Sequence, residues 1–493
     1  MEIKQIKELK NLKKYDTVLL PFIKNEGLKL SKIEDFTDDL INIMENSDFK
    51  ENDEQVYTST LLQNDKLLKI IFLEIKPNKI DIENIFTSFA KGYKKARQIK
   101  GKNLLVLLDN ISEKIDDYFI YEKTVEAAYL SNYIFDKYKS KKETNKIINV
   151  DFFTKIDNFK KALVEAKATS DGTILSRDLV NEPPMRLTPE KLGEEAKKAG
   201  TESGFKVTVY DKSEIEKLKM NAFLSVGKGS ANTPKLIVME YNGSGSSKKI
   251  GLVGKGLTYD SGGYSIKPSK SMSTMHSDMA GAAAVIGAMK IIANMKLKLN
   301  VVAVVAACEN RISHEAYLPG DILESMSGKF IEVNNTDAEG RLTLADAVTY
   351  IKEKHEVESI IDLATLTGAI ITALGVFRAG TFSNNDELHE VIEKASQISG
   401  EKIWRLPCDE ELKESIKSNV ADIRNSTQGS TIGGGSITAA LFIEEFVEDT
   451  PWVHIDIAGT SWTDKALPYS DKGGVGYGAR LLYNYAKLKE NNI

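Results

Sequence analysis

The sequence predicts an α/β protein of two domains, in which a helix joins a smaller N-terminal α/β domain to a three-layer αβα domain with a central mixed sheet. Its 493 residues exceed the size at which one hydrophobic core usually stops growing. Beyond the first third, short apolar runs alternate with helical patterns, as in a sheet covered by helices on both faces. The first third is instead dense in Lys, Asn, Asp and Glu. We expect the domains to span 1–165 and 166–493.

The N-terminal domain shows strand and helix patterns but no catalytic motif. Apolar runs at 18–20, 70–73 and 104–108 are typical of buried strands, and 82–96 has a helical pattern. Apolar residues recur at helical spacing over 159–174, until Pro183 and Pro184 stop the helix. We expect this helix to connect the domains, and the N-terminal domain to serve assembly or a partner.

The second domain shows a series of short strands. They are expected at 206–210, 236–239, 250–253, 301–307, 360–363 and 453–457. The longest apolar run, 301–308, is far below the ~20 residues that span a bilayer, so we interpret it as a buried strand and expect no membrane partner. Glycine and serine gather at strand exits in 261–263 and 433–436. The second run lacks the Lys-Ser/Thr ending of a phosphate-binding loop, so it predicts a turn before a helix and no nucleotide.

Composition excludes several classes of protein. The chain is 42% hydrophobic and 28% charged, as soluble globular proteins are, and its net charge of −5 gives no general attraction to nucleic acid. Its two cysteines, Cys308 and Cys408, cannot form a disulfide framework. The N-terminus lacks the continuous apolar segment of a secretory signal. We therefore expect a cytoplasmic protein.

Acidic residues and lysines concentrate where strands are expected to end. Asp337 and Glu339 follow an apolar run at 330–333, and two positions apart in an extended segment they can aim at one point. Any one such acid alone is more often a solvated loop residue than a ligand. Further charged residues follow the strand at 250–253 or flank the first pair: Lys255, Asp260, Lys267, Asp278 and Arg341. Four acids buried together would repel one another, and two divalent cations would resolve that repulsion.

The residue types restrict the metal. Oxygen ligands suit Mn²⁺, Mg²⁺ or Zn²⁺, whereas the five histidines show no H-E-x-x-H pattern or paired spacing. Lys255 is the unusual candidate, because lysine binds a metal only when neutral. An adjacent dication together with desolvation would lower its pKa enough.

Three segments carry a family resemblance. Residues 335–342 read Asn-Thr-Asp-Ala-Glu-Gly-Arg-Leu, 177–184 read Arg-Asp-Leu-Val-Asn-Glu-Pro-Pro, and 253–265 contain the Gly-Lys-Gly and Asp-Ser-Gly-Gly sequences. These segments resemble the signatures of the leucyl (cytosol) aminopeptidase family, and the resemblance covers essentially all of 170–493. It implies a metallo-exopeptidase that releases amino acids from peptides with a free N-terminus, with attack by a hydroxide shared between two metal ions, in intracellular peptide turnover.

The resemblance also implies a role for each site residue. One ion, Mn²⁺ or Zn²⁺, would be held by Asp260, Asp337 and Glu339, and the other by Lys255, Asp260, Asp278 and Glu339. Lys267 would hold the scissile carbonyl oxygen, and Arg341 would seat a bicarbonate that acts as general base. The substrate side-chain pocket would be lined by Met275, Thr365, Gly368, Ala458 and Ser461. Members of the family assemble as homohexamers, which the resemblance implies here through the catalytic domain.

Two other hypotheses compete with this one. Paired metals also suit phosphoesterases, although such sites usually carry several histidines. Some bacterial members of the family combine peptidase activity with DNA binding, against which the net charge of −5 argues weakly. A catalytically inactive relative is disfavoured, because all seven proposed metal-binding and catalytic residues are present.

Overall fold

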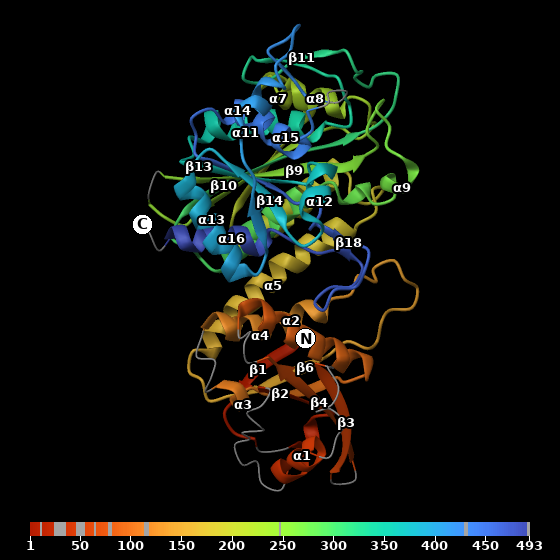
Figure 1. The fold of residues 1–493 in the computed structure, drawn as a ribbon, viewed down its shortest axis with the longest axis vertical. Helices are drawn as coiled ribbons and strands as arrows, with labels where there is room; N and C mark the ends of the chain where they lie inside the picture. Colours follow the sequence, from red (N-terminus) through yellow and green to blue (C-terminus); the bar gives the residue numbers. More distant parts are fainter. Residues whose placement is uncertain are drawn as a thin grey trace. The chain divides into compact units, whose positions relative to one another are not determined.

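The computed structural model describes residues 1–9, 12–23, 36–45, 55–63, 66–76, 81–112, 118–245, 248–427 and 432–490 (Figure 1). The chain divides into an N-terminal unit, 1–170 with 465–472, and a C-terminal unit, 171–464 with 473–493. The division falls inside α5 (Phe159–Asn181), the helix predicted to connect the domains. The predicted boundary near residue 165 lies in the same helix. The assembly or partner role expected of the N-terminal domain stays a prediction.

The N-terminal unit contains a six-stranded mixed sheet of order β1-β6-β5-β2-β4-β3. Its strands are β1 (Glu2–Ile6), β2 (Thr17–Ile23), β3 (Val56–Gln63), β4 (Lys66–Ile75), β5 (Asn103–Leu107) and β6 (Asn149–Phe153). Its helices are η1 (Leu12–Lys14), α1 (Phe36–Glu45), α2 (Ile82–Gln98), α3 (Asp109–Ser112) and α4 (Tyr118–Ser131). The apolar runs predicted as strands lie in the adjacent strands β5, β2 and β4, and every residue of β2 is buried, as a central strand requires.

The C-terminal unit is built on an eight-stranded mixed sheet of order β15-β14-β17-β13-β9-β10-β8-β7. Its strands are β7 (Lys206–Tyr210), β8 (Lys235–Asn242), β9 (Ile250–Asp260), β10 (Asn300–Asn310), β13 (Ser359–Ala364), β14 (Ala379–Ser383), β15 (Ile403–Arg405) and β17 (Trp452–Asp456). The six strands predicted from the sequence are all present. Strands β14 and β15 were not predicted, because they are short and carry polar residues within them.

Helices cover both faces of this sheet, which confirms the predicted αβα layers. Helices α11 and α15 pack together on one face, and α10, α13 and α16 on the other (Figure 1). The helices are α6 (Pro189–Ser203), α7 (Lys212–Lys217), α8 (Asn221–Gly227), α9 (Ser269–Met272), η4 (Met275–Ser277), α10 (Ala280–Asn294), α11 (Gly340–His355), α12 (Gly368–Leu374), α13 (Asp386–Ser399), α14 (Glu410–Glu414), α15 (Gly435–Val447) and α16 (Ala479–Glu490). Two small sheets join β11 (Ile322–Glu324), β12 (Phe330–Glu332) and β16 (Ile423–Arg424), and β18 (Trp462–Thr463) with β19 (Gly473–Gly474). Among the residues that the structure describes, no helix is both long and apolar enough to cross a membrane.

Strand β9 is longer than predicted. The sequence pattern placed its end at residue 253, because Gly254, Lys255 and Gly256 interrupt the apolar run, but pairing with β10 continues as far as Asp260. Lys255 is therefore a strand residue rather than a loop residue, and it is buried. β13 pairs with β9 only as far as Gly254, so β10 is the neighbour that pairs with the backbone of β9 from Lys255 to Asp260, where the apolar pattern has already ended.

Two glycines bring α10 close to this strand. A Cβ built on Gly281 would lie 2.1 Å from the Leu363 carbonyl oxygen, and one built on Gly254 would lie 2.7 Å from the Ala282 backbone. No side chain fits at either position, so glycine alone allows the contact. Since α10 begins two residues after Asp278, this close approach holds Asp278 against β9.

Candidate metal centre

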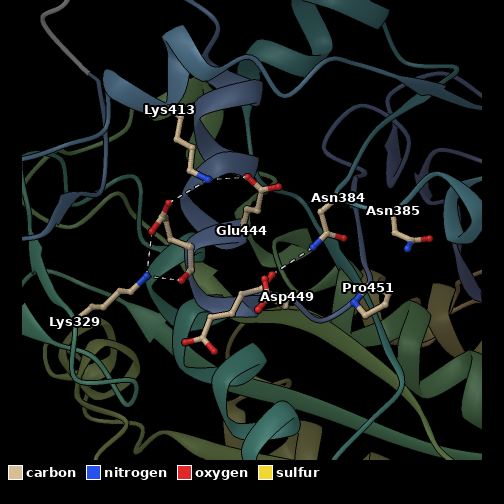
Figure 2. Close-up of a pocket in the computed structure, with 9 residues that line it drawn as sticks. Lys329, Asn384, Asn385, Lys413, Glu444, Asp449 and Pro451 are labelled. Atoms are coloured by element: carbon tan, nitrogen blue, oxygen red, sulfur yellow. Dashed lines mark hydrogen bonds and ion pairs between the residues drawn. The ribbon is translucent and has the colours of Figure 1, made fainter.

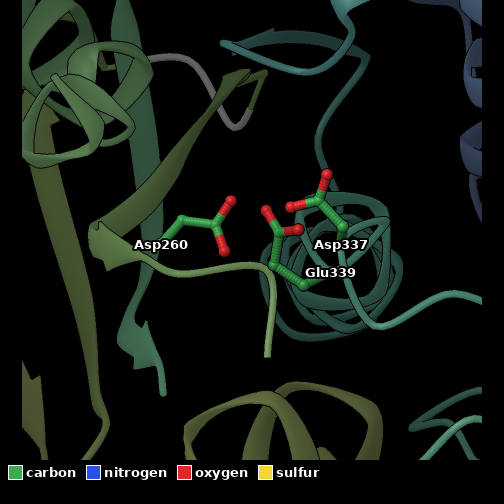
Figure 3. Close-up of side chains that lie close together, drawn as sticks. All are labelled: Asp260, Asp337 and Glu339. Atoms are coloured by element: carbon green, nitrogen blue, oxygen red, sulfur yellow. The ribbon is translucent and has the colours of Figure 1, made fainter. Parts of the chain in front are cut away.

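The acidic residues predicted as ligands gather at the carboxyl edge of the sheet. Asp260 is the last residue of β9, whereas Asp337 and Glu339 lie in the turn directly before α11. One carboxylate oxygen from each of the three lies within 4.8 Å of the other two. Figure 3 shows the three side chains facing one another. The structure thus brings together acids that are up to 79 positions apart in the sequence.

Lys255 links Asp278 to this group. Its Nζ lies 2.9 Å from Asp278 Oδ2 and 2.8 Å from Glu339 Oε1. Burial alone would lower the pKa of Lys255, but the charges of Asp278 and Glu339 outweigh burial and raise that pKa above its usual value. Lys255 is therefore an ammonium ion among these carboxylates. Lys255 must lose its proton to bind a metal, and the charge of a bound cation is needed to lower its pKa enough for that.

Lys267 pairs with the remaining two acids. Its Nζ lies 2.9 Å from Asp260 Oδ2 and 2.6 Å from Asp337 Oδ1. Burial opposes the charge of Lys267 as well, and the carboxylates, Asp260 foremost, again raise its pKa. The sequence predicted that metal ions balance the charge of the acids, whereas two ammonium groups carry part of that balance. Four carboxylates against two ammonium groups still leave an excess of negative charge.

Burial and mutual repulsion disturb the titration of these acids. Burial raises the pKa of Asp260 to about 8, with the charge of Glu339 as the next contribution. Burial likewise raises the pKa of Asp278 to about 6, against the opposing charge of Lys255. Glu339 differs, because Lys255 and Lys267 outweigh its burial and hold its pKa below the usual value. Glu339 is therefore the acid of this group that keeps its negative charge most firmly.

The donor set fits divalent cations. Glu339 Oε2 is buried and has no hydrogen-bond partner among the residues that the structure describes. A buried carboxylate oxygen without a partner is costly, so an oxygen in this position fits a cation that binds beside it. Carboxylate oxygens are ligands of hard and borderline ions such as Mn²⁺ and Zn²⁺.

Sequence reasoning missed two residues that hold the acids in place. Asn310 Nδ2 donates to Asp260 Oδ1 and to the carbonyl oxygen of Thr336, each at 2.9 Å. The Tyr317 hydroxyl donates to the same carbonyl at 2.9 Å. Asn310 is the register partner of Asp260 on the neighbouring strand. Only knowledge of the β9–β10 pairing would have identified it.

Arg341 lies in the first turn of α11, beside the acids. It is buried, and its Nε donates no hydrogen bond to any residue that the structure describes. Burial lowers the pKa of Arg341 to about 10, although the charges of Glu339 and Asp456 oppose that shift. The guanidinium therefore stays charged at neutral pH and can bind an anion.

The residues predicted to form the substrate pocket lie on several segments around the acids. The Thr365 hydroxyl donates to Asp278 Oδ1 at 2.7 Å, and the backbone N–H of Asp278 donates to the Met275 carbonyl at 3.4 Å. Gly368 is the first residue of α12. Ala458 and Ser461 follow β17, which ends at the same edge of the sheet. The pocket as a whole stays a prediction.

A separate cavity of about 430 Å³ lies at the opposite end of β17. Its lining residues are Lys329, Asn384, Asn385, Lys413, Glu444, Glu445, Glu448, Asp449 and Pro451 (Figure 2). Lys329 Nζ lies 3.0 Å from Glu445 Oε2, and Lys413 Nζ lies 3.5 Å from Glu445 Oε1. Both lysines of the lining therefore pair with acids of the same cavity, and none of the proposed metal ligands lines it.

Comparisons with known proteins cover both parts of the chain. Residues 174–483 match the description "Cytosol aminopeptidase family, catalytic domain", and 22–142 match "Cytosol aminopeptidase family, N-terminal domain". A probable cytosol aminopeptidase of Clostridium perfringens is 44% identical over 487 residues, 96% of this chain and 97% of the relative. One of Fusobacterium nucleatum is 42% identical over 480 residues, 97% of this chain and 95% of the relative.

Solved structures share the fold as well. The bottromycin maturation enzyme BotP in complex with Mn superposes with a TM-score of 0.83 at 27% identity, and the match covers 96% of this chain and 99% of BotP.

Proposed function

The chain belongs to the cytosol aminopeptidase family, whose members are metallo-exopeptidases, and from this premise we propose which of its residues carry out the reaction. The observation that supports the proposal most is the convergence of Asp260, Asp337 and Glu339. We assign one ion to these three residues and a second ion to Lys255, Asp260, Asp278 and Glu339. Two divalent ions, Mn²⁺ or Zn²⁺, would supply a nucleophile from water at neutral pH and polarise the peptide carbonyl.

Lys267 is proposed to donate to the scissile carbonyl oxygen. Its ammonium group already reaches the acidic cluster, at 2.9 Å from Asp260 and 2.6 Å from Asp337. Its raised pKa keeps it charged at neutral pH. Because negative charge develops on the carbonyl oxygen only as the bond is attacked, this donor stabilises the transition state more than the bound substrate.

Arg341 is proposed to hold a bicarbonate ion, which would supply a general base when bound. The planar guanidinium can offer two parallel N–H groups to a planar anion. Its Nε is buried and donates no hydrogen bond within the described residues, which leaves that donor for a ligand. No histidine is among the residues assigned to the cluster, so an external base is consistent with the donor set.

The substrates are proposed to be peptides with a free N-terminal amine, with a leucine-like or methionine-like first residue. The ion assigned to Lys255 would also bind the free amine of the substrate. The side chain of the first residue would enter the pocket between Met275, Thr365 and Ala458. Family membership favours this reaction over phosphoester hydrolysis. A homohexamer that acts in cytoplasmic peptide turnover is the expected assembly, and DNA binding by the N-terminal domain stays a hypothesis.

The first test is hydrolysis of leucine amide and of N-acetyl-leucine amide by protein stripped with a chelator and reloaded with Mn²⁺ or Zn²⁺. We expect no cleavage by the stripped protein, and metal-restored cleavage of the free-amine compound alone. Cleavage of the acetylated compound would contradict a role for the free amine. If neither compound is cleaved with any metal, the proposed reaction is contradicted.

The assignment of ions predicts an unequal effect of Asp278→Asn. Asp278 is assigned to one ion, so its replacement should lower the affinity for that ion at least about tenfold and leave the other nearly unchanged, as calorimetric titration of the stripped protein can measure. Asp337→Asn is the matched variant, because Asp337 is assigned to the other ion. If the Asp278→Asn variant binds both ions with the affinities of the wild type, Asp278 is not a metal ligand.

A further inference from the structure

Asp456 is a buried carboxylate to which the mechanism above gives no task. It is the last residue of β17 and is fully buried. Its Oδ1 accepts the backbone N–H groups of Leu366 and Ala458, each at 3.1 Å. Its Oδ2 accepts the hydroxyl of Thr367 at 2.6 Å. One side chain therefore joins the segment after β13 to the segment after β17.

The same contact extends to the start of α15. The Thr367 and Ser436 hydroxyls lie 2.9 Å apart, and both are buried. Thr367 gives its single proton to Asp456, so Ser436 must be the donor between the two hydroxyls. Ser436 follows the glycine run at 433–435, to which the sequence analysis assigned only a turn before a helix. Gly434 in that run has a φ of +66°, which favours glycine at this turn.

The segment that Asp456 holds is also attached to the metal centre. Lys255 Nζ donates to the Thr365 carbonyl at 2.9 Å, and the Thr365 hydroxyl donates to Asp278 Oδ1 at 2.7 Å. Residues 365–367 are therefore fixed to two proposed ligands at one end and to Asp456 at the other. Ala458, on the far side of Asp456, belongs to the proposed pocket wall. The position of that wall relative to the metal centre depends on Asp456.

The surroundings of the Asp456 carboxylate indicate that it serves to link the segments after β13 and β17. Burial raises the pKa of Asp456, against the charge of His454 and the hydrogen bonds from Thr367, Ala458 and Leu366. No lysine or arginine forms an ion pair with it among the residues that the structure describes. Three donors would lose their acceptor if the carboxylate were removed, and buried donors without partners drive the surrounding backbone to rearrange.

We propose that Asp456 is the positioning residue for side-chain selectivity: by joining 365–367, 458 and the start of α15, it sets the distance between the metal centre and the pocket for the first side chain of the peptide. The inference rests on the proposed function, since it concerns the selectivity of that reaction. Asp456 touches neither substrate nor metal in this scheme and acts through the two segments that it connects.

The test compares Asp456→Asn with Asp456→Ala in the metal-loaded protein. The readouts are kcat/KM for leucine amide and for alanine amide, together with the affinities for both metals. Asparagine retains the acceptor for Leu366 and Ala458, and its amide can donate to Thr367, whose hydroxyl then turns to Ser436. We expect Asp456→Asn to keep the wild-type preference for leucine amide over alanine amide. Asp456→Ala should lower that preference about tenfold or more while both metals bind as in the wild type.

Asp346→Ala is the matched control. Asp346 is also a fully buried carboxylate that accepts backbone N–H groups, from Phe223 at 2.9 Å and Met326 at 2.8 Å, but it contacts none of the proposed pocket segments. Its replacement should lower the thermal midpoint and leave the leucine-to-alanine preference unchanged. An equal loss of preference in this control would show that selectivity follows general stability, which would overturn the inference.

Other outcomes are equally decisive. If Asp456→Ala keeps the wild-type preference for leucine amide over alanine amide, the inference is overturned. It is also overturned if Asp456→Asn loses as much of that preference as Asp456→Ala, because the charge of the carboxylate would then matter instead of its hydrogen bonds. If Asp456→Ala does not fold, Thr367→Val and Thr367→Ser replace it. Thr367→Val removes the hydroxyl and should lower the leucine-to-alanine preference, whereas Thr367→Ser retains the hydroxyl and should retain the preference. Equal preferences in the two variants would overturn the inference. Wild-type protein that cleaves neither amide with any metal would overturn the proposed function itself.

Discussion

Replacement of Glu339 by glutamine is expected to lower kcat/KM by at least about 10³-fold while the protein keeps its fold. Glutamine has nearly the shape of glutamate but carries no charge and exposes an N–H₂ group on one side. Glu339 Oε1 pairs with Lys255 at 2.8 Å, and Oε2 is buried without a hydrogen-bond partner in the described structure. In the proposed scheme Glu339 would be a ligand of both ions, so the variant would weaken the binding of each. A loss of 10³-fold corresponds to about 4 kcal/mol of transition-state stabilisation.

The measurement is the rate of leucine amide hydrolysis with Mn²⁺ in excess, and circular dichroism monitors the fold. Glu332→Gln is the control, because Glu332 is an acid of β12, only seven positions before Glu339, and accepts the Ser418 hydroxyl outside the cluster. We expect the control to remain within about twofold of wild type. Near-normal activity of Glu339→Gln would remove the bridging role assigned to Glu339.

Replacement of Lys267 by methionine is the second large effect. We expect kcat to fall about 10²- to 10³-fold with KM within a few-fold of wild type, because the ammonium is proposed to stabilise charge that appears only in the transition state. Methionine retains much of the apolar length of the side chain. Lys267 also neutralises Asp260 and Asp337, so its removal should strengthen metal binding rather than weaken it. The two readouts move in opposite directions, which separates this role from general disruption.

Steady-state kinetics on leucine amide and calorimetric titration of Mn²⁺ measure the two quantities. Lys270→Met is the control, since Lys270 is an exposed lysine in α9, three positions beyond Lys267. A higher KM with an unchanged kcat would assign Lys267 to substrate binding instead. Weaker metal binding would show that Lys267 supports the ligand set.

Much of the fold was predictable from local patterns. Strand β10 reads as a run of valine and alanine, and all its residues are buried. The end of α5 before Pro183 follows from the chemistry of proline, which cannot continue a helix. The short strands β14 and β15 escaped prediction because their stability comes from pairing with neighbours rather than from their own composition.

The candidate site was predictable only in part. Asp337 and Glu339 could be recognised in the sequence because they lie two positions apart in one segment. Lys255 and Asp260 could be recognised because glycines lie close to them in the sequence. Asn310 and Asp456 carry no comparable local signal. Asn310 gains its role from its strand partner Asp260. Asp456 gains its role from Leu366, Thr367 and Ala458, which lie just beyond the ends of β13 and β17.

The sequence by itself determined which chemical groups are available and which short segments form strands and helices, because side-chain periodicity and turn chemistry act over a few residues. It also determined the family, through the motif at 335–342. The tertiary structure alone decided the distances between the four acids predicted as ligands, and that Lys255 and Lys267 each pair with two of them and balance part of their charge. The physical reason is that a pKa, an ion pair or a buried hydrogen bond depends on distances of a few ångströms between atoms that lie far apart along the chain, and only the packing of β9, β10, β13 and β17 sets those distances.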